Sequence, residues 1–404
     1  MMDGALDWRR AISFHAPVRL HMGPGAVDRV GELARPHGAR ALVVTGRHAA
    51  RRTGALDRVL GSLRRAGLEV EVWDGVTPNP EASTVDQGAR HARQVGADVI
   101  VGLGGGSAMD TAKLIAVLVR SGGSAWEYAP IHGPTRRRPT GALPVLAVPT
   151  TSGTGSHVNA TAVVTHPEGR EKLGIWHPLM YPKEAVVDVE LLASMPVAVT
   201  RATGLDVLFQ CIEPYVGRRA SPFSDILAEE GMRLVRRYLV RAVRDGSDME
   251  ARAGMAVADT LAGIAIDQAG VGLIHGLEHP VSGRHGAVHG EGLAALAPAV
   301  MAFNLPARLE RFARIAELLG QQTAGLPVQE AARLAIVAVE ELLQETGATW
   351  GLQELGVQDA DVAVLVDDTL RSMQGAVANN PRESTPEELA ELYRRSLPPL
   401  GHRS

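Results

Sequence analysis

VIVGLGGGS, residues 99–107, runs from three β-branched residues into three consecutive glycines and a serine. A helical pattern begins at Ala108, so we predict a strand, a tight turn and a helix in direct succession. Glycines let the backbone approach a ligand closely, and the free N–H groups and dipole of a helix N-terminus attract anions. The segment therefore predicts an α/β fold with an anion site at the C-terminal end of a strand, although a ligand-free turn would use the same residues.

Strand and helix patterns alternate over the whole N-terminal half of the chain. Short β-rich runs lie at residues 41–45, 70–73, 98–103, 145–149 and 185–189, with amphipathic stretches such as 56–66 and 84–95 between them. Alternation of this kind is typical of a parallel sheet covered by helices. We therefore predict an α/β N-terminal domain.

Beyond about Val199 the patterns are helical, with almost no strand signal. The clearest helical segments are 222–239, 249–268, 309–319, 328–345 and 386–395. Met195-Pro196 ends the preceding pattern, and Thr200 is a suitable N-cap for a new helix. We predict two domains, an α/β domain at 1–195 and an all-helical domain at 196–404.

The composition is that of an ordinary soluble globular protein, with 45% hydrophobic and 21% charged residues. A net charge of −4 gives no basic field for nucleic acid. The single cysteine, Cys211, excludes an internal disulfide and a zinc site built from several cysteines. The N-terminus lacks a signal-peptide pattern, and no apolar run reaches the roughly 18 residues of a spanning helix. We expect a cytoplasmic protein without membrane or nucleic-acid partners.

A second element rich in hydroxyls and glycines, PTTSGTGS at 149–156, follows the predicted strand at 145–149. Its side chains suit a phosphate, a ribose or an amide, but they equally suit a loop that caps a helix. The first element lacks the G-x-G-x-x-G spacing of the standard dinucleotide fingerprint. Asp110 and Lys113 follow it, three residues apart on the predicted helix.

The segment 274–292, IHGLEHPVSGRHGAVHGEG, holds four of the fourteen histidines. His275 and His279 are four residues apart, which puts both rings on one face of a helix. Pro280, Ser282 and Gly283 predict a break or a kink, after which His285 and His289 repeat the spacing. Imidazole is a common metal ligand and a good proton carrier. A histidine-rich helix end would be an ordinary explanation for one of them, but four together favour a site.

Several motifs resemble those of the iron-containing (metal-dependent, group III) alcohol dehydrogenase family. The matching segments are GGGSAMDTAK at 104–113, PTTSGTGSHVNATAVVT at 149–165, FHAPVRLHMGPGAV at 14–27, GVTPNPEASTV at 75–85 and NNPRESTPEELAELY at 379–393. The resemblance implies a Rossmann-like N-terminal domain and an all-helical C-terminal domain, the plan also of dehydroquinate synthases. It further implies that a nicotinamide cofactor and a divalent metal meet in the cleft between them.

The same resemblance assigns residues to the cofactor. Those residues are Gly104, Gly105, Gly106, Ser107, Asp110, Thr150, Thr151, Thr154 and Lys172. The glycines and the serine would hold the pyrophosphate, Asp110 would face the nicotinamide, and the threonines would line the groove. The second motif departs from the family pattern, because His157 and Asn159 stand where many members have Glu and Thr.

Cofactor choice in the family depends on the residue after the first long strand. Members that prefer NAD tend to carry an acidic residue there, whereas this chain has Gly46 followed by Arg47. A carboxylate would repel a 2′-phosphate and a guanidinium would attract one. We predict NADP(H), with NAD(H) as the alternative and an exposed helix start as the non-functional explanation of the arginines.

The metal ligands implied by the resemblance come from two separate segments. Asp206, His275 and His289 fall on three ligand positions, and Gln210 stands where the family has a fourth ligand, a histidine. Two imidazoles and a carboxylate suit Fe²⁺ and also Zn²⁺. The Gln210 amide oxygen would be a weaker ligand, and a water is the alternative. His279 would handle the proton, and His285 is expected at the cleft rim or without a role.

These assignments predict an NAD(P)-dependent alcohol dehydrogenase or aldehyde reductase with a small carbonyl or alcohol substrate, and the family adds a homodimer as an expectation. The metal would polarise the carbonyl while hydride passes to or from the nicotinamide. Gln210 leaves open a metal-independent reductase similar to maleylacetate reductases. A lyase of the dehydroquinate-synthase type and a non-catalytic relative are further alternatives, which the intact loops at 104–107 and 149–156 disfavour.

Overall fold

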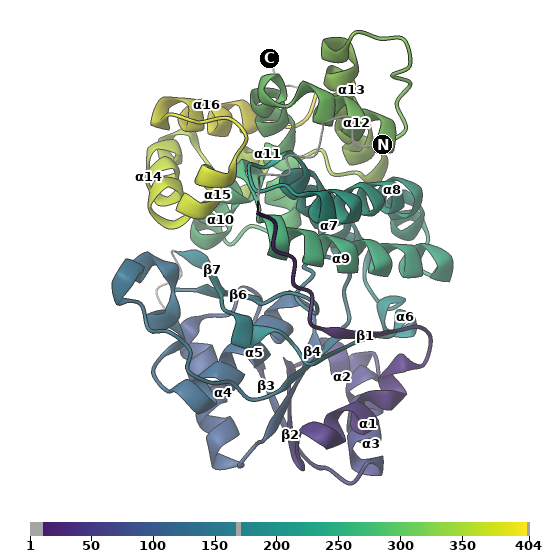
Figure 1. Ribbon diagram of the computed structural model, residues 1–404, viewed down its shortest axis with the longest axis vertical. Coiled ribbons are helices and arrows are strands. Elements are labelled where there is room, and N and C mark those ends of the chain that lie inside the picture. The colour runs from purple at the N-terminus through teal and green to yellow at the C-terminus, as the bar shows by residue number, and fades with distance from the viewer. Residues whose placement is uncertain (1–10, 167–170, 402–404) are drawn as a thin grey trace.

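The computed structural model describes residues 11–166 and 171–401. An α/β part lies at the bottom of Figure 1 and an all-helical part at the top, and the described strands all belong to the lower part. The chain passes from one part to the other between the short helix α6 (Val189–Leu192) and α7 (Val197–Val216). The predicted architecture, a parallel α/β half followed by a helical half, is confirmed.

Six parallel strands form the main sheet in the order β1-β8-β5-β4-β2-β3. Their bounds are β1 (Arg19–Met22), β2 (Arg40–Gly46), β3 (Glu69–Val76), β4 (Val99–Gly104), β5 (Val145–Pro149) and β8 (Glu184–Val187). β4 and β5 lie side by side near the middle of the sheet and are buried along nearly their whole length. A strand buried on both faces is apolar throughout, which is why the runs at 98–103 and 145–149 show no alternation.

Helices cover both faces of this sheet. Val43 and Val101 point to the face covered by α1 (Val30–Ala34) and α3 (Ala55–Arg65). Leu42 and Ile100, one residue earlier along each strand, point to the opposite face, which is covered by the helices α4 (Ala82–Gln94) and α5 (Gly106–Ser121). The period of two along the strands therefore divides the α/β core into two layers.

A two-stranded antiparallel hairpin of β6 (Thr161–Thr165) and β7 (Lys172–Trp176) extends the α/β part toward the helices. β6 packs on α5, and β7 packs on α10 (Leu273–His285) of the helical part (Figure 1). Neither strand was predicted, because each lies beside loop-like sequence. The hairpin brings Lys172 to the boundary between the two parts.

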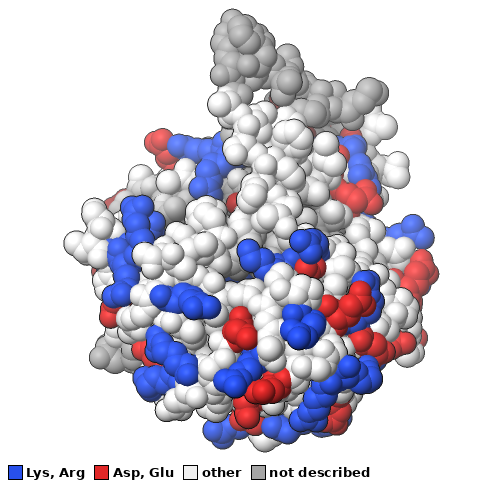
Figure 2. Space-filling view, turned by 60° about the horizontal axis from the view of Figure 1, so that its bottom comes forward, with Lys and Arg blue, Asp and Glu red and all other residues white. Residues whose placement is uncertain are grey.

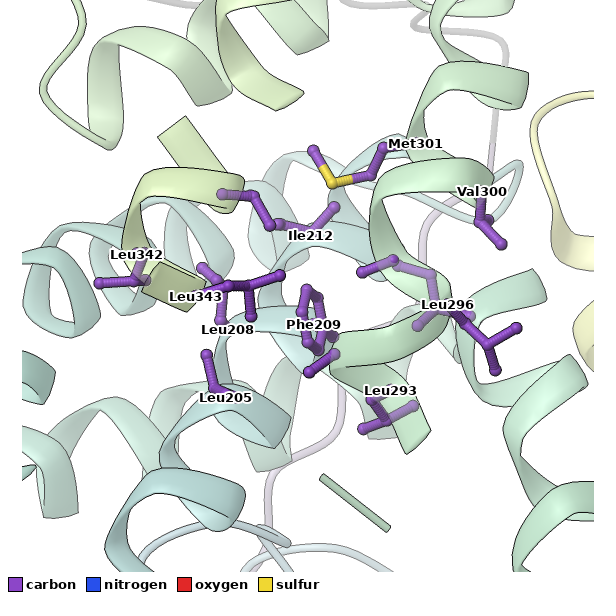
Figure 3. Packing of buried hydrophobic residues seen from close by; sticks show 14 of the residues in the cluster. Leu205, Leu208, Phe209, Ile212, Leu293, Leu296, Val300, Met301, Leu342 and Leu343 are labelled. Atoms are coloured by element: carbon purple, nitrogen blue, oxygen red, sulfur yellow. The ribbon is translucent and has the colours of Figure 1, made fainter. Parts of the chain in front are cut away.

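The helical part is built around α7, which is buried on nearly all sides. Its Leu205, Leu208 and Phe209 pack against Leu293 of α11 (His289–Asn304) and against α13 (Val328–Thr346), as Figure 3 shows. Full burial of a side chain of this size contributes roughly 1.5–3 kcal/mol to the stability of the folded protein. This packing fixes α7 relative to α11, and with it the polar side chains at their ends.

The remaining helices surround this centre. They are α8 (Pro222–Arg244), α9 (Met249–Ala269), α12 (Leu309–Leu318), α14 (Val362–Ser372), α15 (Gln374–Asn379) and α16 (Pro386–Ser396). Among the described residues no single helix is long and apolar enough to cross a membrane, although α9 and α10, bent by 101°, pass that test of length and composition as a pair. Figure 2 shows positive and negative side chains interspersed over one face of the molecule.

Two local predictions about the helices were wrong. Of the break or kink predicted at Pro280, the break is absent: α10 continues to His285, where Gly286 in the left-handed conformation (φ 66°) ends it. Residues 273–283 are all buried, so tertiary packing stabilises the helix despite the lost hydrogen bond of the proline. Thr200 is not an N-cap, because α7 already begins at Val197 and the Thr200 hydroxyl donates to the carbonyl of Pro196 at 3.1 Å.

Candidate functional site

The two glycine-rich motifs meet at the C-terminal ends of β4 and β5. The backbone N–H of Thr150 donates to the carbonyl of Gly104 at 2.9 Å. A Cβ on Gly105 would lie 3.2 Å from Thr151 Oγ1, and one on Gly106 would lie 2.6 Å from Thr154 Cγ2. Glycine is therefore required at position 106, because any side chain would collide with the second motif.

The first motif opens the helix α5. Gly105 is the N-cap, and its carbonyl accepts hydrogen bonds from the N–H groups of Ala108 and Met109. The N–H groups of Gly106 and Ser107 have no helical carbonyl to bind, as in the first turn of any helix. Together with the threonines they lie at one end of the sheet, and such free N–H groups at a helix start suit an anion. The structure brings these residues together, while their contact with a cofactor remains a prediction.

Asp110 and Lys113 lie behind this loop and hold the second motif in place. Asp110 accepts hydrogen bonds from Ser156 Oγ at 2.5 Å and from the N–H of Val163 at 2.9 Å. Lys113 Nζ donates to Ser156 Oγ at 2.8 Å and to Asn159 Oδ1 at 3.1 Å. Burial raises the pKa of Asp110 and lowers that of Lys113 to about 8. Asn159 therefore belongs to this buried network in the structure.

Asp206, His275 and His289 converge although they come from α7, α10 and the start of α11. One ligand atom from each lies within 4.8 Å of the others. Asp206 Oδ1 is 3.3 Å from His275 Nε2 and 3.9 Å from His289 Nε2. A Cβ on Gly290 would lie 1.9 Å from the carbonyl oxygen of Ala202, so this glycine allows α11 to start close to α7. The structure confirms that these three side chains form one cluster.

Buried carboxylates fix the orientation of both imidazoles in this cluster. His275 Nδ1 donates to Glu213 Oε2 at 2.5 Å, and His289 Nδ1 donates to Glu278. A carboxylate accepts only, so each Nδ1 carries a proton, and both Nε2 atoms are directed toward Asp206. Although burial opposes it, Glu213 and Asp206 raise the pKa of His275 to about 10. No sequence motif marks the roles of Glu213 and Glu278.

Gln210 lies one helical turn after Asp206 and is buried. Its Nε2 donates to Asp206 Oδ1 at 2.8 Å. Its Oε1 is buried, and no described residue donates a hydrogen bond to it. A buried amide oxygen without a donor, on a side chain whose nitrogen bonds the carboxylate of the cluster, fits a cation as its missing partner.

His279 differs from the two other imidazoles in its hydrogen bond. Its Nδ1 lies 3.2 Å from the backbone carbonyl of Lys172, so Nδ1 carries the proton and Nε2 is the free basic nitrogen. The ring centre lies 5.4 Å from that of His289 and 6.4 Å from that of His275. Burial, with the charges of Lys172 and His289, lowers the pKa of His279 well below its ordinary value. His279 is therefore a neutral imidazole beside the cluster.

Two residues that the sequence analysis named, His285 and Arg47, lie away from this cluster. His285 ends α10, and its Nε2 is 3.9 Å from Asp361 Oδ2, near the surface. Arg47 is exposed after Gly46 at the end of β2, near the Arg51–Asp74 ion pair of 3.2 Å. Gly46 thus lies at the same edge of the sheet as the glycine-rich loop, two strands away from β5.

Comparison with known proteins adds to this geometry. The protein-family model described as iron-containing alcohol dehydrogenase matches residues 17–189. The family model for the C-terminal part of the Fe-containing alcohol dehydrogenase family matches residues 200–397. The chain belongs to the iron-containing alcohol dehydrogenase family. It is therefore an oxidoreductase that acts on CH–OH donors, as its motifs implied.

Curated and solved relatives cover nearly the full length. NAD-dependent methanol dehydrogenase of Bacillus methanolicus is 36% identical over 95% of this chain and 100% of that protein. 1,3-Propanediol dehydrogenase of Klebsiella pneumoniae is 37% identical over 96% of this chain and 99% of its own. The crystal structure of the alcohol dehydrogenase ADH/D1, from an archaeal halo-thermophilic source in a Red Sea brine pool, has a TM-score of 0.91 at 34% identity and covers 96% and 100% of the two chains.

Proposed function

We propose that this iron-containing alcohol dehydrogenase family member transfers hydride between NADP(H) and a small alcohol or aldehyde at a divalent metal site. The observation that carries the proposal is the convergence of two imidazole Nε2 atoms on Asp206 Oδ1, at 3.3 and 3.9 Å. The glycine-rich loop lies at the ends of the neighbouring strands β4 and β5, where α/β folds bind nucleotides. Together these features support an alcohol dehydrogenase or aldehyde reductase.

The metal would be held by Asp206, Gln210, His275 and His289. Bound there, it supplies Lewis acidity toward the substrate oxygen, where negative charge develops as a carbonyl accepts hydride. Two imidazoles and a carboxylate are typical ligands of Fe²⁺, and the amide oxygen of Gln210 adds a hard donor. We therefore propose Fe²⁺, with Zn²⁺ as the second candidate.

His279 would move the proton of the reaction. The carbonyl of Lys172 holds its Nδ1–H, so Nε2 is the atom that gains or loses a proton. Because the pKa of His279 is lowered, Nε2 is unprotonated near neutral pH and acts as the acceptor in alcohol oxidation. In aldehyde reduction the same nitrogen would pass a proton from solvent to the product alkoxide.

The preference for NADP(H) over NAD(H) rests on the end of β2. Gly46 places no carboxylate there, and Arg47 is exposed beside it. Asp74 on the neighbouring strand β3 is already paired with Arg51 at 3.2 Å, which offsets its negative charge. A 2′-phosphate would therefore meet a net positive surface.

A direct assay tests the proposal. Purified protein is given NADPH or NADH, Fe²⁺ or Zn²⁺, and a broad panel of small aldehydes, with excess chelator in parallel. We expect cofactor oxidation that depends on metal and is faster with NADPH. No turnover on any aldehyde would contradict the proposal, and full activity in chelator would indicate a metal-independent reductase instead.

We also propose a homodimer. The edge strand β1 leaves its outer backbone edge unpaired among the described residues, and Leu20 on it is 42% exposed. An exposed edge strand readily pairs with another chain. Light scattering on the purified protein gives the mass that decides between monomer and dimer.

A further inference from the structure

We propose that Glu278 is a positioning residue of the metal centre. Its carboxylate holds His289 with Nε2 toward Asp206. It also adds a negative charge that compensates for the weak, uncharged donor Gln210 in the ligand set. This inference rests on the proposed function, because it concerns how the chain prepares its metal ligands.

Glu278 is fully buried in the middle of α10, and its side chain has a site built for it. The His289 imidazole and the Ser282 hydroxyl both donate to its carboxylate. A Cβ on Gly292 of α11 would lie 2.8 Å from Glu278 Cγ, so a glycine there makes room for the side chain. Burying a carboxylate is costly unless it is paired, and here the partner is a metal ligand.

The three imidazoles of the site differ in the hydrogen-bond partner of Nδ1. His275 and His289, the two proposed ligands, each donate Nδ1–H to a buried glutamate, whereas His279 donates to the neutral carbonyl of Lys172. A carboxylate behind an imidazole fixes the tautomer and raises the basicity of the other nitrogen. The two histidines that would bind the metal are therefore stronger electron-pair donors at Nε2. His279, which would handle the proton, has no carboxylate behind it and stays neutral.

Charge gives the second reason. Asp206 is the single anionic residue among the four proposed ligands, and it is already hydrogen-bonded to Gln210 Nε2 at 2.8 Å. Glu213 and Glu278 add two negative charges directly behind the imidazoles, and the single positive charge of Lys172, which acts on Glu278, offsets only one of them. Their combined charge lowers the energy of a dication at the cluster, which an amide ligand alone would do weakly.

Glu278 is a better test residue than Glu213. Glu213 Oε1 also accepts the backbone N–H of Ile274 at 2.6 Å, so its replacement would disturb the start of α10. Among the described residues Glu278 accepts hydrogen bonds from two side chains, His289 and Ser282, so its replacement leaves the helix backbone unaffected. Glu278→Gln keeps the size and an acceptor for His289 while it removes the charge.

The experiment measures Co²⁺ affinity by competition with a chelator, together with the Co²⁺ absorption spectrum, which reports ligand geometry. Ser282→Ala is the matched control, since it removes the other partner of Glu278 and keeps the carboxylate. We expect Glu278→Gln to bind Co²⁺ about 10–100-fold more weakly, with a shifted spectrum, and Ser282→Ala to stay within about threefold of wild type.

Unchanged affinity and spectrum in Glu278→Gln, beside normal Co²⁺ binding by the wild type, would overturn this inference and leave the proposed function standing. A wild-type protein that binds no Co²⁺ would contradict the proposed function itself and the inference with it. If the Gln variant does not fold, Glu278→Asp takes its place. It keeps the negative charge but moves the carboxylate away from His289 by the length of one methylene. We expect it to lose affinity as well, and wild-type affinity in that variant would overturn the inference.

Discussion

Asp259 of α9 accepts a hydrogen bond of 2.7 Å from the backbone N–H of Gly155, and this contact ties the second glycine-rich motif to the helical part of the molecule. Gly155 has φ 60°, and a Cβ on it would lie 2.2 Å from the Cα of Gly263 on the same helix. The proposed cofactor loop is thus in direct backbone contact with α9. Cofactor binding and the position of the helices are therefore expected to depend on each other.

Asp259→Ala should weaken cofactor binding. The N–H of Gly155 would lose its acceptor in a buried place, which costs about 1–3 kcal/mol. We expect the Kd for NADPH to rise about tenfold, measured by fluorescence titration, with metal content unchanged. Asp259→Asn, which retains an acceptor oxygen, should stay close to wild type. Equal Kd values for the Ala variant and the wild type would show that this contact does not position the loop.

Gly46→Asp should reverse the choice of cofactor. A Cβ at Gly46 meets only the carbonyl oxygen of Val76 at 3.6 Å, an ordinary contact, so the backbone accommodates a side chain. The new carboxylate repels a 2′-phosphate and accepts a hydrogen bond from a ribose 2′-hydroxyl. We expect kcat/KM for NADPH to fall at least tenfold and that for NADH to rise or hold. If both values fall equally, position 46 does not contact the ribose.

His279→Asn and His275→Ala should fail in different ways. Loss of a proton-handling group lowers kcat by about 10²–10⁴-fold and leaves the metal bound. Loss of a ligand removes the metal and the activity together. Metal analysis beside steady-state kinetics separates the two outcomes. A His279 variant that loses metal, or a His275 variant that keeps it, would show that the two roles are assigned to the wrong residues.

Gln210→His should tighten metal binding. Imidazole nitrogen is a stronger donor than an amide oxygen for Fe²⁺ and Zn²⁺, and the position faces Asp206 across one helical turn. We expect the Kd for Zn²⁺, measured by chelator competition, to fall at least tenfold. Gln210→Leu is the matched control that removes the oxygen and should weaken binding. No change in either variant would place residue 210 outside the ligand set.

His157 gives a prediction about pH. Its Nε2 bonds Thr260 Oγ1 at 2.9 Å, and burial, with the charge of Lys113, lowers its pKa to about 3 from 6.5. Below pH 6.5 the unfolded chain binds a proton that the folded chain does not, so stability is lost as pH falls toward 3. The loss is about 2 kcal/mol at pH 5. His157→Gln should therefore lose less Tm than the wild type between pH 7.5 and 5; an equal loss contradicts the prediction.

The sequence predicted those parts of the molecule that depend on local pattern or on short motifs. The strand, glycine turn and helix at 99–121 follow from β-branched residues and glycines in immediate succession. The cluster of Asp206 with His275 and His289 was predicted because the resemblance to a known family assigns Asp206 in one segment and both histidines in another. The first feature needs no knowledge of how distant segments pack, whereas for the second that knowledge comes from the family.

Other features depend on packing between distant segments, which no local pattern records. Glu213 and Glu278 looked like ordinary helical charges, and only the crossing of α7, α10 and α11 places them behind imidazoles. α10 passes through Pro280 because its whole length is buried. The contact of Asp259 with Gly155 joins residues from the two halves of the chain, so neither half alone predicts it.

The central claim is that Asp206, Gln210, His275 and His289 hold a catalytic divalent metal. The most direct measurement is anomalous diffraction at the iron and zinc edges from crystals of the active protein with NADPH bound. We predict one strong peak within ligand distance of both imidazole Nε2 atoms, Asp206 Oδ1 and Gln210 Oε1. Crystals of fully active protein with no peak at this position would contradict the claim.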